Sequence, residues 1–348
     1  MTTTASFDYL KKSRQKTGLI LVAALLLLLS LFFDIATGPG EFSLSEIWQV
    51  IFQPDALGAR MNIIIWDIRI PTALMAVLVG AMLSAAGAEM QTILNNPLAD
   101  PFTLGISSAA SFGAAVAIVV GVETIPIFGE GLITVSAFSF ALATALFLYL
   151  FTRLRGSTSE TMVLVGIALL FAFNALLSLL QYTATDAQLS QIVFWMMGSL
   201  GRSNWVNITV CFAVLCCVMP VFFYRSWALT ALRMGDDKAA SLGINVKRLR
   251  IEMLLGVSLL AATAVSFVGT IGFIGLVGPH IARMIVGENQ RFFLPMSIIS
   301  GALIMSLTSI LSKSITTGVV YPVGIITALI GIPFFISLIL TVQRRSWH

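Results

Sequence analysis

Apolar runs long enough to cross a lipid bilayer follow one another along almost the whole chain, and they limit the fold more than any other feature. The runs lie at 17–36, 70–92, 102–121, 131–152, 160–181, 205–224, 249–270, 272–287, 292–311 and 323–342. A helix needs about 20 apolar residues to cross the hydrocarbon layer of a membrane. Charged residues make up only 10% of the 348 residues, against roughly 25% in a soluble domain. The sequence therefore predicts an all-α polytopic membrane protein with about ten transmembrane helices in a single domain over 1–348.

The Lys and Arg residues lie on alternate connections between these runs. With a cytoplasmic N-terminus, all but four of the 20 basic residues fall in cytoplasmic segments, in agreement with the positive-inside rule. The first run resembles a signal peptide but no small-residue cleavage site follows it, so we interpret it as an uncleaved first helix. The sequence thus predicts a multi-pass membrane protein with both termini in the cytoplasm. Its basic character requires no nucleic-acid partner.

The four remaining cations lie at the outer ends of spans or in outer loops: Arg60, Arg69, Arg202 and Lys313. Long basic side chains at helix ends commonly extend to water, and this is the simpler interpretation. The alternative is that they meet an acidic partner outside the membrane.

Groups that catalyse reactions or bind metals are scarce. The sequence has no GxxxxGK[ST] loop, HExxH motif or GxSxG motif. Cys211, Cys216 and Cys217 lie in one apolar run without metal-ligand spacing, and the only histidines are His280 and His348. We therefore expect no catalytic residue, no metal site and no cofactor bound by this chain.

Two short segments outside the spans have helical spacing. Residues 43–52 alternate polar and apolar faces, which predicts an amphipathic helix at the outer surface. Residues 188–200 predict a second short outer helix that leads into the sixth span.

The longest cytoplasmic connection, 226–245, predicts a helical hairpin. Helical periodicity breaks at Gly235 and stops at Gly243, and Asp236 or Asp237 is suited to cap the second helix. A polar hairpin between two spans favours docking onto another protein over a plain solvated loop.

Two further connections are rich in proline and glycine. Pro97 and Pro101 prevent one continuous helix across 95–105, where Asn96 and Asp100 are suited to cap the next helical segment, so we expect a rigid cytoplasmic elbow. Residues 269–283 have glycine at nearly every third position, which favours an irregular, tight outer reversal over a straight helix. We interpret His280 in that segment as a hydrogen-bonded structural residue and not as a metal ligand.

These motifs, in this order, resemble the FecCD family of type II ABC importer permeases for iron-siderophores, haem and vitamin B12. The resemblance covers essentially the whole chain. It rests on Arg-Ile-Pro at 69–71, the segment 80–91 followed by Asn-Pro-Leu-Ala-Asp-Pro, Phe-Trp-Met-Met-Gly-Ser-Leu at 194–200, Gly-Asp-Asp-Lys-Ala-Ala-Ser-Leu-Gly at 235–243, Gly-Phe-Ile-Gly-Leu with Pro-His-Ile-Ala-Arg in 272–283, and the segment 322–335.

The resemblance implies a set of partners: a second permease subunit, two cytoplasmic ATPase subunits that bind ATP and Mg, and a soluble periplasmic or lipid-anchored substrate-binding protein. It also implies roles for particular residues, including a path lined by spans two, five and ten. The ATPase-coupling positions are Met234, Gly235, Asp236, Asp237, Ala239, Ala240, Leu242 and Gly243; the binding-protein docking positions are Arg69 and Lys313; the motif positions along the path or shaping it are Gln91, Asn96, Pro97, Asp100, Pro101, Gly105, Pro279 and His280.

The sequence also departs from the family pattern. Thr72 stands where a second arginine is common, Ser309 and Val320 stand where many members have acids, and Asn95 replaces an arginine. These changes suit a heterodimer in which a related permease supplies the missing charges, although a homodimer remains open.

The resemblance implies import of an iron-siderophore, with haem and cobalamin as alternatives within the family. A secondary transporter driven by an ion gradient would show an inverted repeat or buried ionisable groups. Glu89 is the only acid deep in a predicted span, and no such repeat is evident. An intramembrane enzyme would show catalytic groups. Dependence on an ATPase and a binding protein separates the importer from both alternatives.

Overall fold

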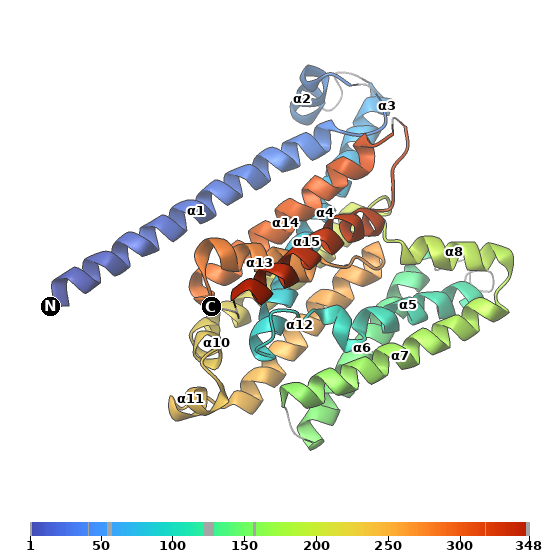
Figure 1. The fold of residues 1–348 in the computed structure, drawn as a ribbon. Helices are drawn as coiled ribbons and strands as arrows, with labels where there is room; N and C mark the ends of the chain where they lie inside the picture. The colour runs from blue at the N-terminus through green and yellow to red at the C-terminus, as the bar shows by residue number, and fades with distance from the viewer. Residues whose placement is uncertain are drawn as a thin grey trace.

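The computed structural model describes residues 2–40, 42–53, 58–121, 129–155, 158–316 and 318–345, and this part of the chain contains helices and no strand. The helices are α1 (Thr2–Ala36), α2 (Leu44–Phe52), α3 (Ala59–Asn62), η1 (Ile63–Arg69), α4 (Ile70–Ile93), η2 (Pro101–Leu104), α5 (Ile106–Val116), η3 (Ala117–Gly121), α6 (Gly129–Arg155), α7 (Ser159–Thr183), α8 (Asp186–Met196), α9 (Trp205–Tyr224), α10 (Ser226–Leu232), α11 (Asp236–Ser241), α12 (Val246–Val268), α13 (Ile274–Val286), α14 (Gln290–Ser314) and α15 (Val323–Arg345). Figure 1 shows both chain ends on the side of the bundle that carries α10 and α11, opposite α2. We call these two sides the hairpin end and the α2 end.

The predicted all-α membrane fold is confirmed. Seven helices in the described residues are long and apolar enough to cross a bilayer, and three shorter apolar helices occupy the other predicted runs. The run at 102–121, predicted to be one span, is divided into η2, α5 and η3. The second span begins earlier than predicted, because α3 and the π-helical η1 continue into α4 and extend the helix over Ala59–Ile93.

Helix α4 forms the centre of the bundle. It packs against α14, α12, α13, α9 and α1. Within the continuous helix Ala59–Ile93, 83% of the most apolar stretch of 18 residues is buried inside the chain. Small residues allow these close approaches, since Gly80 lies against Gly301 of α14 and Gly87 lies against Gly275 of α13. Almost all of α4 is thus buried within this chain, and the expectation that spans two, five and ten line a path between two permeases stays a prediction.

We predict that Gly87→Ala lowers the free energy of unfolding by about 1–3 kcal/mol, the usual cost of overpacking. A Cβ at Gly87 would overlap the backbone of Gly275, and backbone cannot move aside as a flexible side chain can. The matched control is Gly18→Ala in α1, where a Cβ would meet nothing within 4 Å. Thermal unfolding of the two purified variants in one detergent checks the prediction, and equal melting temperatures would contradict it.

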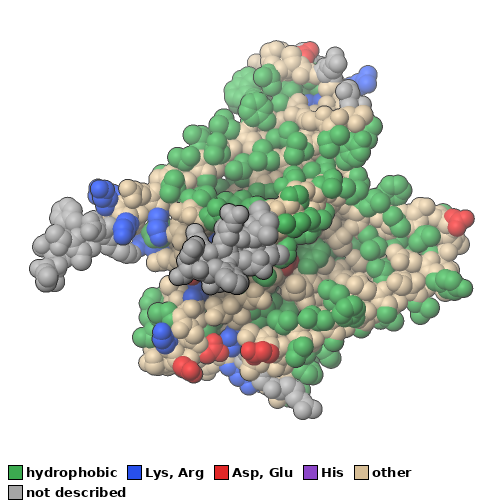
Figure 2. Space-filling view, viewed as in Figure 1, with side chains coloured by type: hydrophobic (Ala, Val, Ile, Leu, Met, Phe, Trp, Pro, Cys, Tyr) green, Lys and Arg blue, Asp and Glu red, His purple; other side chains and the backbone are tan. Residues whose placement is uncertain are grey.

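The outer surface of the bundle is apolar. In α1 and α7 only 11% of the most apolar stretch of 18 residues is buried within the chain, and in α9 the share is 22%. Figure 2 shows hydrophobic side chains over most of the visible sides, whereas charged side chains gather below, around the hairpin end. This distribution is the one expected of a protein whose sides face lipid.

The two predicted short helices are present. Helix α2 has a capping box in which Ser43 and Glu46 satisfy each other's backbone N–H groups. Helix α8 has the same arrangement between Thr185 and Gln188, and it begins two residues before the predicted start. It ends at Met196 rather than Leu200, because Gly198 adopts a positive φ of 71°.

The reversal before α13 is also confirmed, with positive φ at Gly269 (78°) and Phe273 (70°). The irregularity ends there, however, and α13 is a continuous helix through Pro279. A proline at this position removes the N–H that would bond to the carbonyl of Gly275. The Gln91 side chain takes its place, since Nε2 donates to the Gly275 oxygen at 3.3 Å. This bond satisfies the carbonyl oxygen that the proline leaves without its helical partner.

Candidate functional site

The candidate residues divide between the two ends of the bundle. The coupling positions and the elbow lie at the hairpin end, whereas Arg69 and Lys313 lie at the α2 end, near the ends of η1 and α14. The two groups are described in turn.

The predicted hairpin is present as α10 and α11, joined at Arg233–Gly235. Gly235 has φ of 105° and Gly243 has φ of 82°, a region that residues with a Cβ rarely adopt. The predicted cap by Asp236 or Asp237 is wrong. Gly235 occupies the N-cap position without a side-chain bond, and Asp236 is already helical and turns toward α12.

One surface of the hairpin is exposed. Most coupling positions lie on it: Met234, Asp236, Asp237, Ala240, Leu242 and Gly243 are exposed, Gly235 is half-buried, and Ala239 is fully buried beneath α11. The apolar Met234 and Leu242 are therefore presented to the surroundings and not to the core. Such a surface is available to a protein partner.

Arg250 of α12 fixes the hairpin to the core. Its guanidinium forms a bidentate pair with Asp236 at 2.8 and 2.9 Å, and its Nε donates to the carbonyl of Ile93 at 2.9 Å. Ile93 is the last residue of α4. A single buried side chain thus joins α11, α12 and the end of α4.

Arg233, directly after α10, forms a second anchor. Its Nη1 lies 3.1 Å from Oε1 of Glu288, and Arg283 of α13 approaches the same oxygen at 3.2 Å. Both guanidinium groups lie over the ring of Phe293, which is fully buried in α14. Arg283 also donates to Gln91 of α4 at 2.8 Å. The hairpin, α13, α14 and α4 therefore meet in one cluster.

Buried polar groups of α4 extend this cluster inward. Glu89 is fully buried, and its Oε1 has no hydrogen-bond partner. Gln290 donates from Nε2 to Thr92 at 2.8 Å and to the other Glu89 oxygen at 3.4 Å. The backbone N–H of Gln290 donates to Thr230 of α10 at 3.1 Å. Gln290 therefore links α10 to the buried polar groups of α4.

The predicted elbow between α4 and α5 is confirmed in its main features. Asp100 caps η2, since its Oδ1 accepts from the N–H of Phe102 at 2.8 Å, and Pro101 follows as the first residue of η2. Asn96 accepts from Leu98 at 2.9 Å and so closes a turn instead of capping a helix. Gly105 has φ of 75° and lies against the backbone of α7.

Pro97, Pro279 and His280 lie where the elbow, α13 and α15 come together. Pro97 and His280 line one small hollow with Phe273 and Phe334, and Pro279 is buried in the neighbouring turn of α13. The expected hydrogen bond of His280 is not what the described residues show, because its ring instead meets Phe334 edge-on at 5.5 Å. His280 is a packing residue in this structure.

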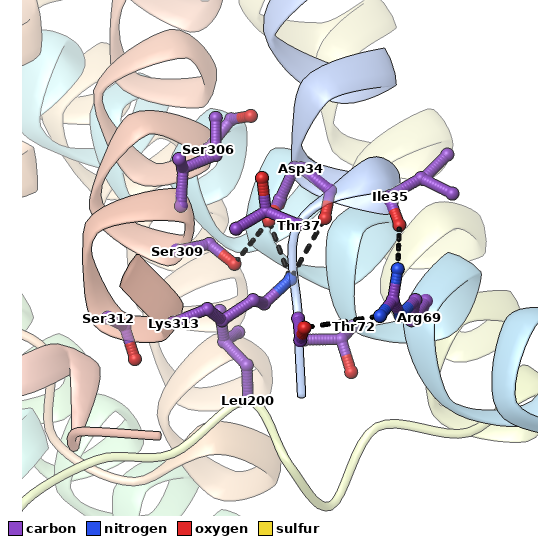
Figure 3. Close-up of polar contacts among 12 residues, drawn as sticks. Asp34, Ile35, Thr37, Arg69, Thr72, Leu200, Ser306, Ser309, Ser312 and Lys313 are labelled. Carbon is purple, nitrogen blue, oxygen red and sulfur yellow. Dashed lines mark hydrogen bonds and ion pairs between the residues drawn. The ribbon is translucent and has the colours of Figure 1, made fainter. Parts of the chain in front are cut away.

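At the α2 end, Lys313 forms a buried ion pair. Its Nζ lies 2.6 Å from Oδ1 of Asp34 and 3.2 Å from the Asp34 carbonyl, and Ser309 donates to the same Oδ1 at 2.9 Å. The two charged side chains are 6% and 0% exposed. Figure 3 shows Lys313 and Ser309 of α14 pointing toward Asp34 at the end of α1.

Arg69 is also buried, and its guanidinium binds the segment that follows α1. Nη1 donates to the carbonyl of Ala36 at 2.8 Å, and Nη2 donates to three carbonyls over Gly38–Gly40 at 3.0–3.2 Å. The cation also lies 4.9 Å from the ring of Phe42. Neither predicted docking cation is presented at the surface of this chain. Both organise the connection between α1 and α2.

Sequence reasoning missed the partners of these cations. It does not single out Asp34, although an acid at the end of an apolar run is a signal that it has a partner. It uses Arg233, Arg250 and Arg283 only to assign the cytoplasmic side. None of them indicates, from its position alone, that it anchors the hairpin.

Comparisons with known proteins agree with this arrangement. The model of the FecCD transport family matches residues 26–341. A protein of Methanocaldococcus jannaschii assigned as an ABC transporter permease is 38% identical, with 97% of this chain and 99% of that protein covered. A protein of Helicobacter pylori assigned as the permease of an iron chelatin transport system is 39% identical, with 81% and 83% covered.

A solved structure and further relatives indicate the class of transporter to which the chain is similar. A chain described as belonging to a metal-chelate type ABC transporter, in an inward-facing conformation, matches with a TM-score of 0.80 and 32% identity over 93% of this chain and 99% of that one. Other relatives are named as permeases for hemin, molybdate and vitamin B12. The family model matches nearly the whole chain, and the solved transporter structure has the same fold. This chain therefore belongs to the FecCD transport family and is a membrane permease subunit of an ABC importer.

Proposed function

We propose that this permease imports a ferric siderophore across the cytoplasmic membrane of a bacterium, with the hairpin end in the cytoplasm. The observation that carries the mechanism is the α10–α11 hairpin, whose outer surface is exposed while its base is tied to α4 by Arg233 and Arg250. An element that is exposed on one side and anchored in the core on the other suits the transmission of force from a partner.

In this proposal two ATPase subunits bind ATP and Mg and contact the exposed hairpin residues. Their movement displaces α10 and α11 together with the end of α4, and the cargo passes between this chain and a second permease. The chain itself performs no covalent chemistry and binds no cofactor. Coupling depends on the anchors, because a hairpin free to move by itself transmits nothing to the spans.

A soluble or lipid-anchored binding protein delivers the cargo at the α2 end. The burial of Arg69 and Lys313 supports an indirect role for both, in which they fix the α1–α2 connection that the binding protein meets. Arg60 is exposed at this end and is available for direct contact with an acidic surface.

The cargo is tested with the full complex in nanodiscs. ATP hydrolysis and uptake are measured with binding protein loaded with a ferric siderophore, haem, cobalamin or molybdate. We expect the ferric siderophore to stimulate both activities, because iron chelatin is the cargo in the name of a relative that is 39% identical. Stimulation by one of the other three cargoes alone would reassign the substrate, and uptake without any ATPase would reject the importer mechanism.

A further inference from the structure

A groove of about 480 Å³ lies at the hairpin end, where α9 ends and α12 begins. Its walls include Tyr224, Arg225 and Trp227 on one side and Asn245 and Arg248 on the other. It is separate from the exposed coupling residues, of which only Gly243 reaches its rim.

The groove carries an excess of positive charge. Arg225 and Arg248 share a single carboxylate, since Arg225 Nη2 lies 2.8 Å from Oε2 of Glu252 and Arg248 Nε lies 2.8 Å from Oε1. Lys247 precedes Arg248 in the chain but lies outside the groove walls, and its Nζ bonds to the carbonyl of Arg153 at 3.3 Å. The two arginines outnumber the acid that they surround, and the site is complementary to an anion.

The groove also has exposed aromatic side chains at its edge. Tyr224 is 80% exposed and ends the apolar α9, and Trp227 is 64% exposed at the start of α10. The sides of α9 are largely uncovered by the rest of the chain. Tyrosine and tryptophan collect at the boundary between lipid tails and water, where an apolar ring and a polar group are both satisfied. The aromatic edge therefore places the groove at the membrane interface.

We propose that this groove binds the headgroup of an anionic phospholipid. The phosphate lies between Arg225 and Arg248, and the acyl chains follow the exposed surface of α9. Basic pockets between transmembrane helices are known to hold acidic lipid headgroups, and guanidinium groups bind phosphate oxygens in a bidentate manner. The lipid is favoured over an ATPase subunit as the occupant, because the aromatic edge continues a surface that faces lipid.

The test uses the complete complex in nanodiscs and the fluorescence of Trp227, isolated as the difference between the parent protein and Trp227→Phe. Phosphatidylglycerol or phosphatidylcholine with brominated acyl chains serves as the quencher. We expect phosphatidylglycerol to reach half-maximal quenching at a clearly lower mole fraction than phosphatidylcholine. Arg248→Gln should weaken the phosphatidylglycerol preference about fivefold, the effect of one cation near an anionic headgroup.

The controls separate the sources of the anion. Arg248 is 74% exposed, so its replacement leaves the fold intact, and Lys247→Gln provides a second variant with a smaller expected loss. Arg291→Gln removes an exposed cation at the same end but outside the groove, and it should leave the preference unchanged. Equal quenching by both lipids in the complete complex, or competition by millimolar inorganic phosphate, would each overturn the proposal.

Discussion

Replacing Arg233 with glutamine is expected to destabilise the permease by about 2 kcal/mol, the value of a desolvated cation on an aromatic ring, here the buried ring of Phe293. Arg233 also acts electrostatically on Glu89, a fully buried acid with one oxygen that accepts no hydrogen bond, without forming an ion pair with it. The variant also removes the ion pair with Glu288 that joins the hairpin to the α13–α14 connection. Thermal unfolding in detergent gives the stability, and transported cargo per ATP hydrolysed gives the coupling. Both should fall.

The double variant Arg233→Gln with Glu89→Gln distinguishes electrostatic pairing from simple packing. Removing both charges should recover only the part of the lost stability that comes from Glu89, whereas coupling should stay low because the anchor is still absent. Arg291→Gln is the matched control, since Arg291 is also stacked on a ring at the start of α14 but is exposed. A double variant no more stable than Arg233→Gln alone would show that Glu89 does not depend on this arginine.

The positions of the spans were largely predictable, because a membrane span leaves a signal along the sequence itself. The hairpin was predictable for a similar reason, since Gly235 and Gly243 mark two chain reversals that favour glycine. The division of 102–121 was not predictable. The apolar character there is continuous, and the break after Gly105 depends on contact with the backbone of α7.

The pairing of the charges could not be read from one sequence. Lys313 and Asp34 are separated by 279 positions, and Arg283 and Gln91 by 192. Only the packing of α1, α13 and α14 around α4 brings these groups together. The burial of α4 was hidden as well, because a uniformly apolar helix with many small residues is compatible with both a lipid-facing and a central position. Its glycines become informative only when the facing glycines of α13 and α14 are known.

Replacing Lys313 with methionine is expected to cost about 3–5 kcal/mol of stability, because Asp34 is fully buried and the lysine is its only ion-pair partner in the described part of the chain. The double variant Asp34→Asn with Lys313→Met should regain most of this loss, since asparagine still accepts the hydrogen bond from Ser309. Thermal unfolding of the three proteins checks these values. An unchanged melting temperature for Lys313→Met would contradict the buried pair.

The same variants decide how the α2 end receives a binding protein. If Lys313 contacts the partner directly, Lys313→Met should weaken binding and the double variant should bind equally weakly, because the cation is absent from both. If Lys313 only fixes the α1–α2 connection through Asp34, the double variant should recover both stability and affinity. We expect recovery, because the ammonium group already lies 2.6 Å from an acid of its own chain and is almost inaccessible. Titration of the binding protein against each variant in nanodiscs measures the difference.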